Sequence, residues 1–139
     1  MEIIEITENK KKYLDLLLLA DEQENMIDRY LDNGRMYILN DNGVKSECVI
    51  TDERNGVLEI KNIATVPEHQ GKGYAKALID FIVEKYSEQY AVLQVGTGDS
   101  PLTIPFYEKC GFVRSHIIPN FFTDNYGHPI YDCFLLGTL

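Results

Sequence analysis

The sequence predicts a single domain of mixed α/β class, in which helices cover a β-sheet. Its 139 residues suit one domain, and 45% of them are apolar, which is enough to bury a core. Short stretches of strand character recur along the chain, separated by turns that contain glycine. Between them lie segments whose apolar residues repeat with the 3.6-residue period of a helix. This succession of helices and strands is typical of a layered α/β domain.

The N-terminal half predicts two helical segments followed by a three-stranded meander. Residues 11–20 and 22–31 carry apolar side chains at helical spacing, and Asn33-Gly34 follows as a C-cap signal. The expected strands and turns are, in order, strand 36–39, turn 41–43, strand 45–51, turn 54–56 and strand 57–66.

The strand at residues 57–66 is the longest one expected. By strict alternation, one face carries Glu59, Lys61 and Ile63, and the other carries Leu58, Ile60, Asn62 and Ala64.

The C-terminal half predicts an amphipathic helix at residues 73–86, which is followed by shorter elements. A short helix is expected before Gly111, which has the place of the C′ residue, and Pro105 falls in its first turn. The expected strands are 91–95, 112–118 and 131–136.

Composition excludes several classes of partner. The net charge of −9 disfavours nucleic-acid binding, which requires a basic face. No run of about 18 apolar residues predicts a membrane span, and the first five residues lack the features of a signal peptide. Three widely spaced cysteines and three scattered histidines show neither a disulfide framework nor a metal-ligand spacing. We therefore expect a cytoplasmic protein with no metal, no membrane and no nucleic-acid partner.

A glycine-rich turn joins the longest expected strand to the longest expected helix. Residues 70–75 read Gln-Gly-Lys-Gly-Tyr-Ala. Such a turn presents free backbone N–H groups at a helix N-terminus, where the macrodipole is positive, and this geometry holds phosphate. Gly71 and Gly73 let the backbone approach an anion closely, and Lys72 and Lys76 add positive charge. The segment predicts a site for a polyanionic ligand.

Three phosphate-binding motifs are candidates for this turn. A P-loop requires Gly-x4-Gly-Lys-[Ser/Thr], which the sequence lacks, and a dinucleotide fingerprint requires a third glycine where Lys76 stands. The third motif, [Gln/Arg]-x-x-Gly-x-[Gly/Ala], matches residues 70–75 at every fixed position. In this the chain resembles the GNAT superfamily of acyl-CoA-dependent N-acyltransferases.

A second motif strengthens the resemblance. Residues 106–112 read Phe-Tyr-Glu-Lys-Cys-Gly-Phe, which is similar to the family's Tyr-x-Lys-x-Gly-Phe motif at the expected distance downstream. The sequences of residues 95–98 and 107–112 also resemble those of a small bacterial subgroup labelled indoleacetate acetyltransferase. The resemblance covers residues 10–133 and implies one GNAT domain over residues 1–139. Its sheet would be mixed and mostly antiparallel, with helices on both faces and a splayed central strand pair.

The resemblance also implies acetyl-CoA as cosubstrate. The pantetheine arm would lie between the splayed strands, and the pyrophosphate would lie on the glycine-rich turn. The implied cofactor-binding residues are Ile63, Ala64, Thr65, Gln70, Gly71, Lys72, Gly73, Tyr74, Ala75, Lys76, Asp99 and Ser100. Asp99 stands where family members often have Asn; since a carboxylate cannot donate as an amide does, Ser100 is the alternative donor.

Tyr107 matches the family's usual general acid, which protonates the departing thiolate. A tyrosine pKa of about 10 against a thiol pKa of about 8.5 makes this transfer uphill by about 2 kcal/mol in water. Desolvation of the thiolate narrows the gap, so the role requires a dry pocket. The structural alternative is a core aromatic residue beside Phe106 and Phe112.

Glu59 is the candidate general base, because some family members carry a catalytic glutamate at this place on the long strand. An alkylamine of pKa about 10.4 is only about 0.04% neutral at pH 7, so a base aids its attack. The alternative is a strand glutamate paired with Lys61. An arylamine acceptor would need no base.

The acceptor is expected to be a primary amine of a small molecule or peptide. An aromatic wall for it is expected from Phe121, Phe122, Tyr126, His128 and Tyr131, unless these residues make edge packing or a homodimer contact. Two other functions stay open: a non-catalytic acyl-CoA-binding regulatory module, and an enzyme that uses another acyl donor or an O-acceptor.

Overall fold

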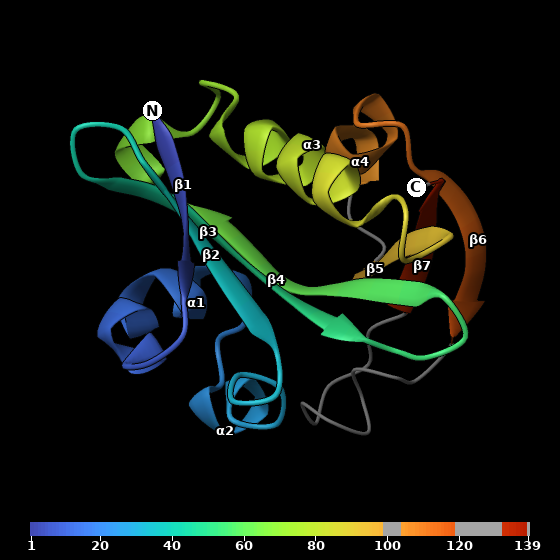
Figure 1. Ribbon diagram of the computed structural model, residues 1–139, viewed down its shortest axis with the longest axis horizontal. Coiled ribbons are helices and arrows are strands. Elements are labelled where there is room, and N and C mark those ends of the chain that lie inside the picture. Colours follow the sequence, from blue (N-terminus) through green and yellow to red (C-terminus); the bar gives the residue numbers. More distant parts are fainter. Residues whose placement is uncertain (99–103, 119–131, 139) are drawn as a thin grey trace.

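A seven-stranded sheet runs through the computed structural model, which describes residues 1–98, 104–118 and 132–138 (Figure 1). The strands are β1 (Glu2–Ile6), β2 (Arg35–Asn40), β3 (Val44–Asp52), β4 (Val57–Thr65), β5 (Val92–Gly98), β6 (Val113–Ile118) and β7 (Asp132–Thr138). Their order in the sheet is β1-β2-β3-β4-β5-β7-β6. Every neighbouring pair is antiparallel except β4 and β5, which are parallel. The predicted mixed, mostly antiparallel sheet is confirmed.

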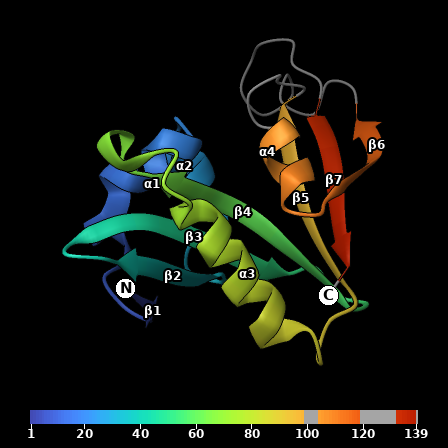
Figure 2. The same cartoon turned by 90° about the horizontal axis from the view of Figure 1, so that it is seen from above.

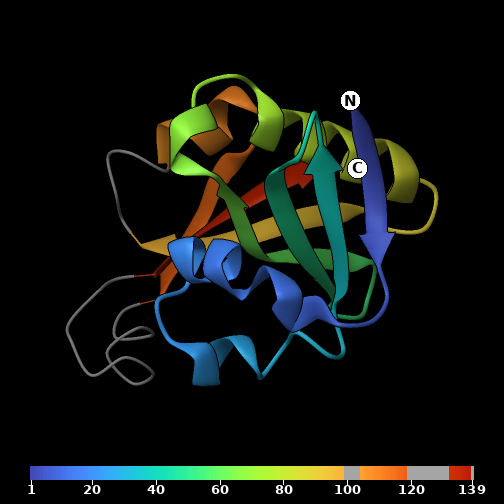
Figure 3. The same ribbon diagram turned by 90° about the vertical axis from the view of Figure 1, so that its left-hand side faces the viewer.

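Helices cover both faces of this sheet, as predicted. The helices are α1 (Leu14–Ala20), α2 (Glu24–Ile27), α3 (Tyr74–Tyr86) and α4 (Ile104–Lys109). Figures 1 and 3 show α1 and α2 on one side of the sheet and α3 on the other. The larger core lies under α3 and α4, where Leu78, Ile82 and Tyr107 are buried against the sheet. A smaller core lies under α1 and α2 around Leu17 and Ile27.

The parallel strands β4 and β5 separate partway along their length. They pair only from Val57 opposite Val92 to Ile60 opposite Val95. β4 then continues to Thr65 and β5 to Gly98 without pairing to each other. Figure 2 shows the two strands diverging from the end at which they pair. The splayed strand pair that the family resemblance implied is therefore present, and one main-chain edge of β4 is open after Ile60.

A β-bulge in β4 corrects the predicted faces of the long strand. Val49 lies opposite Asn62 and Ile50 lies opposite Ile60, so Lys61 has no partner of its own on β3. An extra residue in one strand reverses the alternation beyond it. Ile63 therefore joins the α3 side, and Asn62 and Ala64 turn to the α1 side. The strict alternation assumed from the sequence was wrong from the bulge onward.

β1 was missed in the sequence. It is an edge strand of five residues that pairs only with β2, and none of its side chains is fully buried. The two predicted N-terminal helices are also shorter than expected. A 3-10 turn at Lys10–Tyr13 precedes α1, and α2 is a single turn, Glu24–Ile27. None of the helices in residues 1–98 and 104–109 is both long and apolar enough to cross a bilayer.

The ends of α3 and α4 follow the predicted signals. Gly73 is the N-cap of α3 with φ +85°, and α3 ends at Tyr86. Gly111 has φ +98°, and the N–H groups of Gly111 and Phe112 donate to the carbonyls of Glu108 and Tyr107. This is the Schellman arrangement that stops a helix at a glycine. It places Tyr107 on the last turn of α4, facing the core.

Candidate active site

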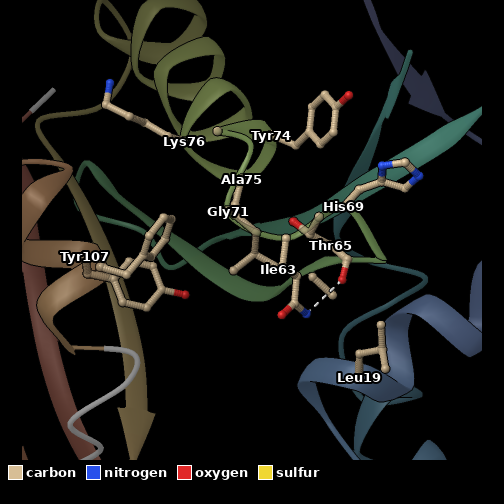
Figure 4. Close-up of a pocket in the computed structure, with 13 residues that line it drawn as sticks. Leu19, Ile63, Thr65, His69, Gly71, Tyr74, Ala75, Lys76 and Tyr107 are labelled. Carbon is tan, nitrogen blue, oxygen red and sulfur yellow. Dashed lines mark hydrogen bonds between the residues drawn. The ribbon is translucent and has the colours of Figure 1, made fainter. Parts of the chain in front are cut away.

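A cavity of about 490 Å³ opens where β4 leaves β5. Its lining comes from α1, the end of β4, the glycine-rich turn, the start of α3, and α4 (Figure 4). The lining residues are Leu19, Ile63, Ala64, Thr65, His69, Gln70, Gly71, Gly73, Tyr74, Ala75, Lys76, Phe106 and Tyr107. The structure therefore brings most of the predicted cofactor-binding residues into one cavity together with the predicted acid, Tyr107.

The N-terminus of α3 forms one end of this cavity and has no side-chain cap. The first N–H groups of a helix have no intrahelical partner, so those that begin α3 are free for an anion. Gly71 and Gly73 have φ +81° and +85°, a conformation that favours glycine, and a Cβ at either would meet no atom within 4 Å. The glycines thus permit the positive φ of this turn and leave open space next to its backbone. That space suits a pyrophosphate.

Two lysines add positive charge at this end, although each already has a partner. Lys76 Nζ lies 2.8 Å from Asp80 Oδ2 on the exposed side of α3. Lys72 Nζ lies 3.1 Å from His69 Nδ1, and Lys72 is not among the cavity-lining residues. At this end the backbone N–H groups, more than these side chains, are free to bind an anion.

Side chains tie the end of β4 to the turn and to β3. Gln70 Nε2 of the turn donates to the Thr65 carbonyl at 3.3 Å (Figure 4). Ser46 Oγ of β3 donates to the Ala64 carbonyl at 2.7 Å. Gln70 thus does not point at a ligand but holds the turn in place. The carbonyls of Ala64 and Thr65 are thus occupied, and the remaining main-chain groups on the side of β4 that β5 leaves after Ile60 are open to an extended ligand.

Tyr107 lies at the other side of the cavity with 7% of its surface exposed (Figure 4). Its ring packs edge-on against Phe106 and Phe112, at centroid distances of 5.1 and 5.6 Å. Burial raises the pKa of the Tyr107 hydroxyl, and the charges of neighbouring groups raise it further. The hydroxyl is therefore protonated at neutral pH, and it releases its proton only to a strongly basic group.

Glu59 lies apart from Tyr107 and does not line the cavity. Its carboxylate is 2.6 Å from Lys61 Nζ and accepts a hydrogen bond from Gln94 Nε2 at 2.5 Å. Both oxygens of Glu59 are thus occupied, as in the paired strand glutamate that was the structural alternative.

Other predicted residues lie outside the described part of the chain. They are Asp99 and Ser100, and the aromatic wall of Phe121, Phe122, Tyr126, His128 and Tyr131. Sequence reasoning did not select Leu19, His69 or Phe106, which line the cavity. Leu19 is 52% exposed although it belongs to a run of leucines. Only its position around the helix distinguishes it from the buried leucines of α1.

Comparison with known proteins agrees with this geometry. The profile of the acetyltransferase (GNAT) domain family matches residues 32–114, which include β4, the glycine-rich turn and α4. An uncharacterized N-acetyltransferase of Bacillus subtilis, YvbK, is 33% identical over 128 residues, covering 90% of this chain and 83% of its own length.

Two solved structures share the whole fold. A GNAT family acetyltransferase from Elizabethkingia anophelis, with acetyl-CoA bound, has a TM-score of 0.91 and 31% identity, covering 99% of this chain and 97% of its own. An IAA acetyltransferase from Bacillus cereus has a TM-score of 0.87 and 30% identity, covering 99% of this chain and all of its own. The family match, the relatives and the shared fold together show that this chain belongs to the GNAT family of acetyltransferases.

Proposed function

We propose that this acetyltransferase moves the acetyl group of acetyl-CoA directly to a primary amine of a small molecule or peptide. The observation that carries the proposal is the uncapped N-terminus of α3, which opens into the cavity at the splay of β4 and β5. One end of the cavity fits a pyrophosphate and the other holds a buried hydroxyl donor. A relative with acetyl-CoA bound supports the choice of donor.

The proposed roles follow from the places of the residues. The N–H groups of the turn and of the first residues of α3 bind the pyrophosphate, and Lys76 adds charge at its rim. The open edge of β4 at Ile63, Ala64 and Thr65 pairs with the pantetheine amides. Bound acetyl-CoA supplies the thioester whose carbonyl carbon the amine nitrogen attacks.

Tyr107 completes the transfer in this proposal. A new C–N bond forms, the C–S bond breaks with its electron pair on sulfur, and Tyr107 protonates that sulfur. Burial raises the pKa of Tyr107, but a thiolate in the same dry cavity also becomes a stronger base, so the transfer stays within reach. The reaction would take place in the cytoplasm, where the free thiols of Cys48 and Cys110 would stay reduced.

The first experiment measures thermal unfolding of the protein with acetyl-CoA, with CoA and without ligand. At 100 times the dissociation constant, binding adds about 2.7 kcal/mol to the free energy of unfolding, a shift of several degrees in Tm for a domain of this size. We expect the Gly73→Glu variant to lose this shift. Gly43→Glu is the matched control, because Gly43 also has a positive φ but lies in the β2–β3 hairpin.

A panel of amines with acetyl-CoA then separates the enzyme from a non-catalytic binding module. Release of free CoA that depends on the amine supports the proposal. A clear shift in Tm without any turnover would favour the binding module, and no shift would overturn the acyl-CoA site itself.

A further inference from the structure

Three buried oxygen atoms on the α1 side of the sheet have no hydrogen-bond donor among the described residues. They are both carboxylate oxygens of Glu47 and Oδ1 of Asn62. Glu47 is 0% exposed and Asn62 is 2% exposed. A buried acceptor that lacks a donor costs about 1–3 kcal/mol, so the fold carries a destabilising feature that an outside donor would relieve.

The two residues share one face of neighbouring strands because of the bulge at Lys61. Glu47 on β3 lies directly opposite Ala64 on β4, and Asn62 lies opposite Val49, two residues further along β3. Such diagonal neighbours on one face are about 7–8 Å apart at their Cα atoms. Without the bulge, alternation would put Asn62 on the α3 side of the sheet, and Asn62 would not share a face with Glu47.

The direction of the Asn62 amide is determined by its partners. Nδ2 donates to the Leu17 carbonyl and to Tyr30 Oη, each at 3.0 Å. A carbonyl can only accept, so the nitrogen of the amide must face Leu17. Oδ1 is therefore the end of the amide that is left without a donor.

Both residues neighbour residues that line the cavity. Ala64, which is opposite Glu47, lines the cavity, and so does Leu19, two residues after Leu17 on α1. The charge of Glu47 also acts on Tyr107, which lines the same cavity.

Glu47 and Glu59 make a contrasting pair on the same side of β3 and β4. The carboxylate of Glu59 is neutralised by Lys61 and occupied by Gln94. The carboxyl group of Glu47 has no cation and no donor beside it in the described residues. A group whose lone pairs are free and which lies beside the cavity is the better proton acceptor.

We propose that Glu47 takes the proton from the ammonium group of the acceptor, through one water molecule held with the help of Asn62 Oδ1. This inference rests on the proposed function. R–NH3⁺ gives one proton to the carboxylate, which leaves R–NH2 and a carboxylic acid. The amine then attacks the thioester, its nitrogen loses a second proton to Tyr107 as Tyr107 protonates the sulfur, and Glu47 returns its proton to solvent between turnovers.

The surroundings of Glu47 suit this exchange. Burial raises the pKa of Glu47, which makes its carboxylate a stronger base than that of an exposed glutamate. The ionisable groups that interact with it are Tyr30, which follows α2, Cys48 on β3 and Tyr107 on α4. Burial also raises the pKa of each of these, which favours their neutral forms.

The test compares Glu47→Gln with Glu59→Gln, using an alkylamine and an arylamine as acceptors at saturating concentration. We expect Glu47→Gln to lower kcat for the alkylamine by about 10²–10⁴-fold and to remove the fall of kcat at acidic pH. Turnover of the arylamine, which is already neutral at pH 7, should persist. Glu59→Gln should keep the acidic fall, whatever its rate.

Three outcomes would overturn the proposal. They are an acidic fall that survives in Glu47→Gln, an acidic fall that disappears in Glu59→Gln alone, and an equal loss for both kinds of amine. Glu47→Asp serves as the second variant if Glu47→Gln folds poorly. In Glu47→Asp, kcat should still fall at acidic pH, with a shifted midpoint.

The proposed function fails separately, if the wild type binds acetyl-CoA and acetylates no amine of the panel. The role of Glu47 is then decided by binding alone. With CoA present, an alkylamine should raise the Tm of the wild type and not that of Glu47→Gln, and equal shifts in the two proteins would exclude an ammonium beside Glu47.

Discussion

The two ends of the cavity are built in different ways. At the start of α3 the site is made of backbone: two glycines with positive φ, an uncapped helix end, and lysines that already have partners. At the end near α1 the features are side chains: Leu19 from a helix lines the cavity, and Glu47 and Asn62, buried on two strands, lie next to lining residues. The first end comes from one short stretch of sequence, and the second from residues far apart in it.

This difference predicts how each end responds to substitution. A backbone site tolerates the loss of a nearby side chain, because its N–H groups remain. A site made of side chains loses its chemistry when a substitution removes one reactive atom. The expected effects below therefore become smaller from the reacting centre toward the phosphate end.

The largest effect is expected at Tyr107, the proposed proton donor. Tyr107→Phe should lower kcat by about 10²–10⁴-fold and leave the dissociation constant of acetyl-CoA unchanged, because only the hydroxyl group is lost and the ring remains. Steady-state kinetics and calorimetric titration measure the two quantities. Tyr37→Phe is the matched control, since Tyr37 is a buried tyrosine of the same core that does not line the cavity. Equal rates for the wild type and Tyr107→Phe would leave Tyr107 as a packing residue.

The next effect is a pH-dependent difference in stability between the wild type and Glu47→Gln. Burial raises the pKa of Glu47 in the folded protein, whereas an unfolded glutamate has a pKa of about 4.3. Below that value both states hold the proton and no penalty exists. As the pH rises above it, the unfolded state gains by ionising, so the wild type should lose up to about 1.4 kcal/mol per pH unit relative to the variant.

This loss should continue until the pH passes the folded pKa of Glu47. Urea unfolding of both proteins from pH 4 to pH 8 measures it, with Glu59→Gln as the comparison. If the difference in free energy of unfolding between wild type and Glu47→Gln stays constant with pH, the pKa of Glu47 is not raised in the folded protein. The carboxyl group would then have a partner or contact with water.

The sequence predicted the end of the cavity that is built from neighbouring residues of the chain. It missed the end that is built from residues far apart in the chain. Residues 70–75 and 106–112 are continuous motifs, so the turn, the start of α3 and the position of Tyr107 followed from them. The role of Asn62 depends on the bulge at Lys61, which appears only in the pairing of β4 with β3. Glu47 looks like any strand glutamate in the sequence, and no local pattern of polar and apolar residues reports that it is fully buried.

A smaller effect is expected for Asn62→Ala. Leu17 O and Tyr30 Oη both lose a donor, although each keeps a bond to Asp21. We expect the free energy of unfolding to fall by about 1–3 kcal/mol in urea denaturation. Tyr30→Phe removes one of the two acceptors of Asn62 and should cost about 0.5–1.5 kcal/mol. An unchanged stability of Asn62→Ala would show that the amide does not hold the end of α1.

The smallest effect is expected at the phosphate end, where Lys72→Gln and Lys76→Gln remove charge from an exposed rim. An exposed charge pair contributes about 0.2–1 kcal/mol, so each variant should weaken CoA binding by at most about fivefold. High salt should erase the difference, because it screens exposed charges. Lys85→Gln, at the other end of α3, is the control and should bind CoA as the wild type does. A loss of a hundredfold from either lysine variant would mean that side chains, and not the helix N-terminus, hold the phosphates, and the contrast between the two ends of the cavity would fail.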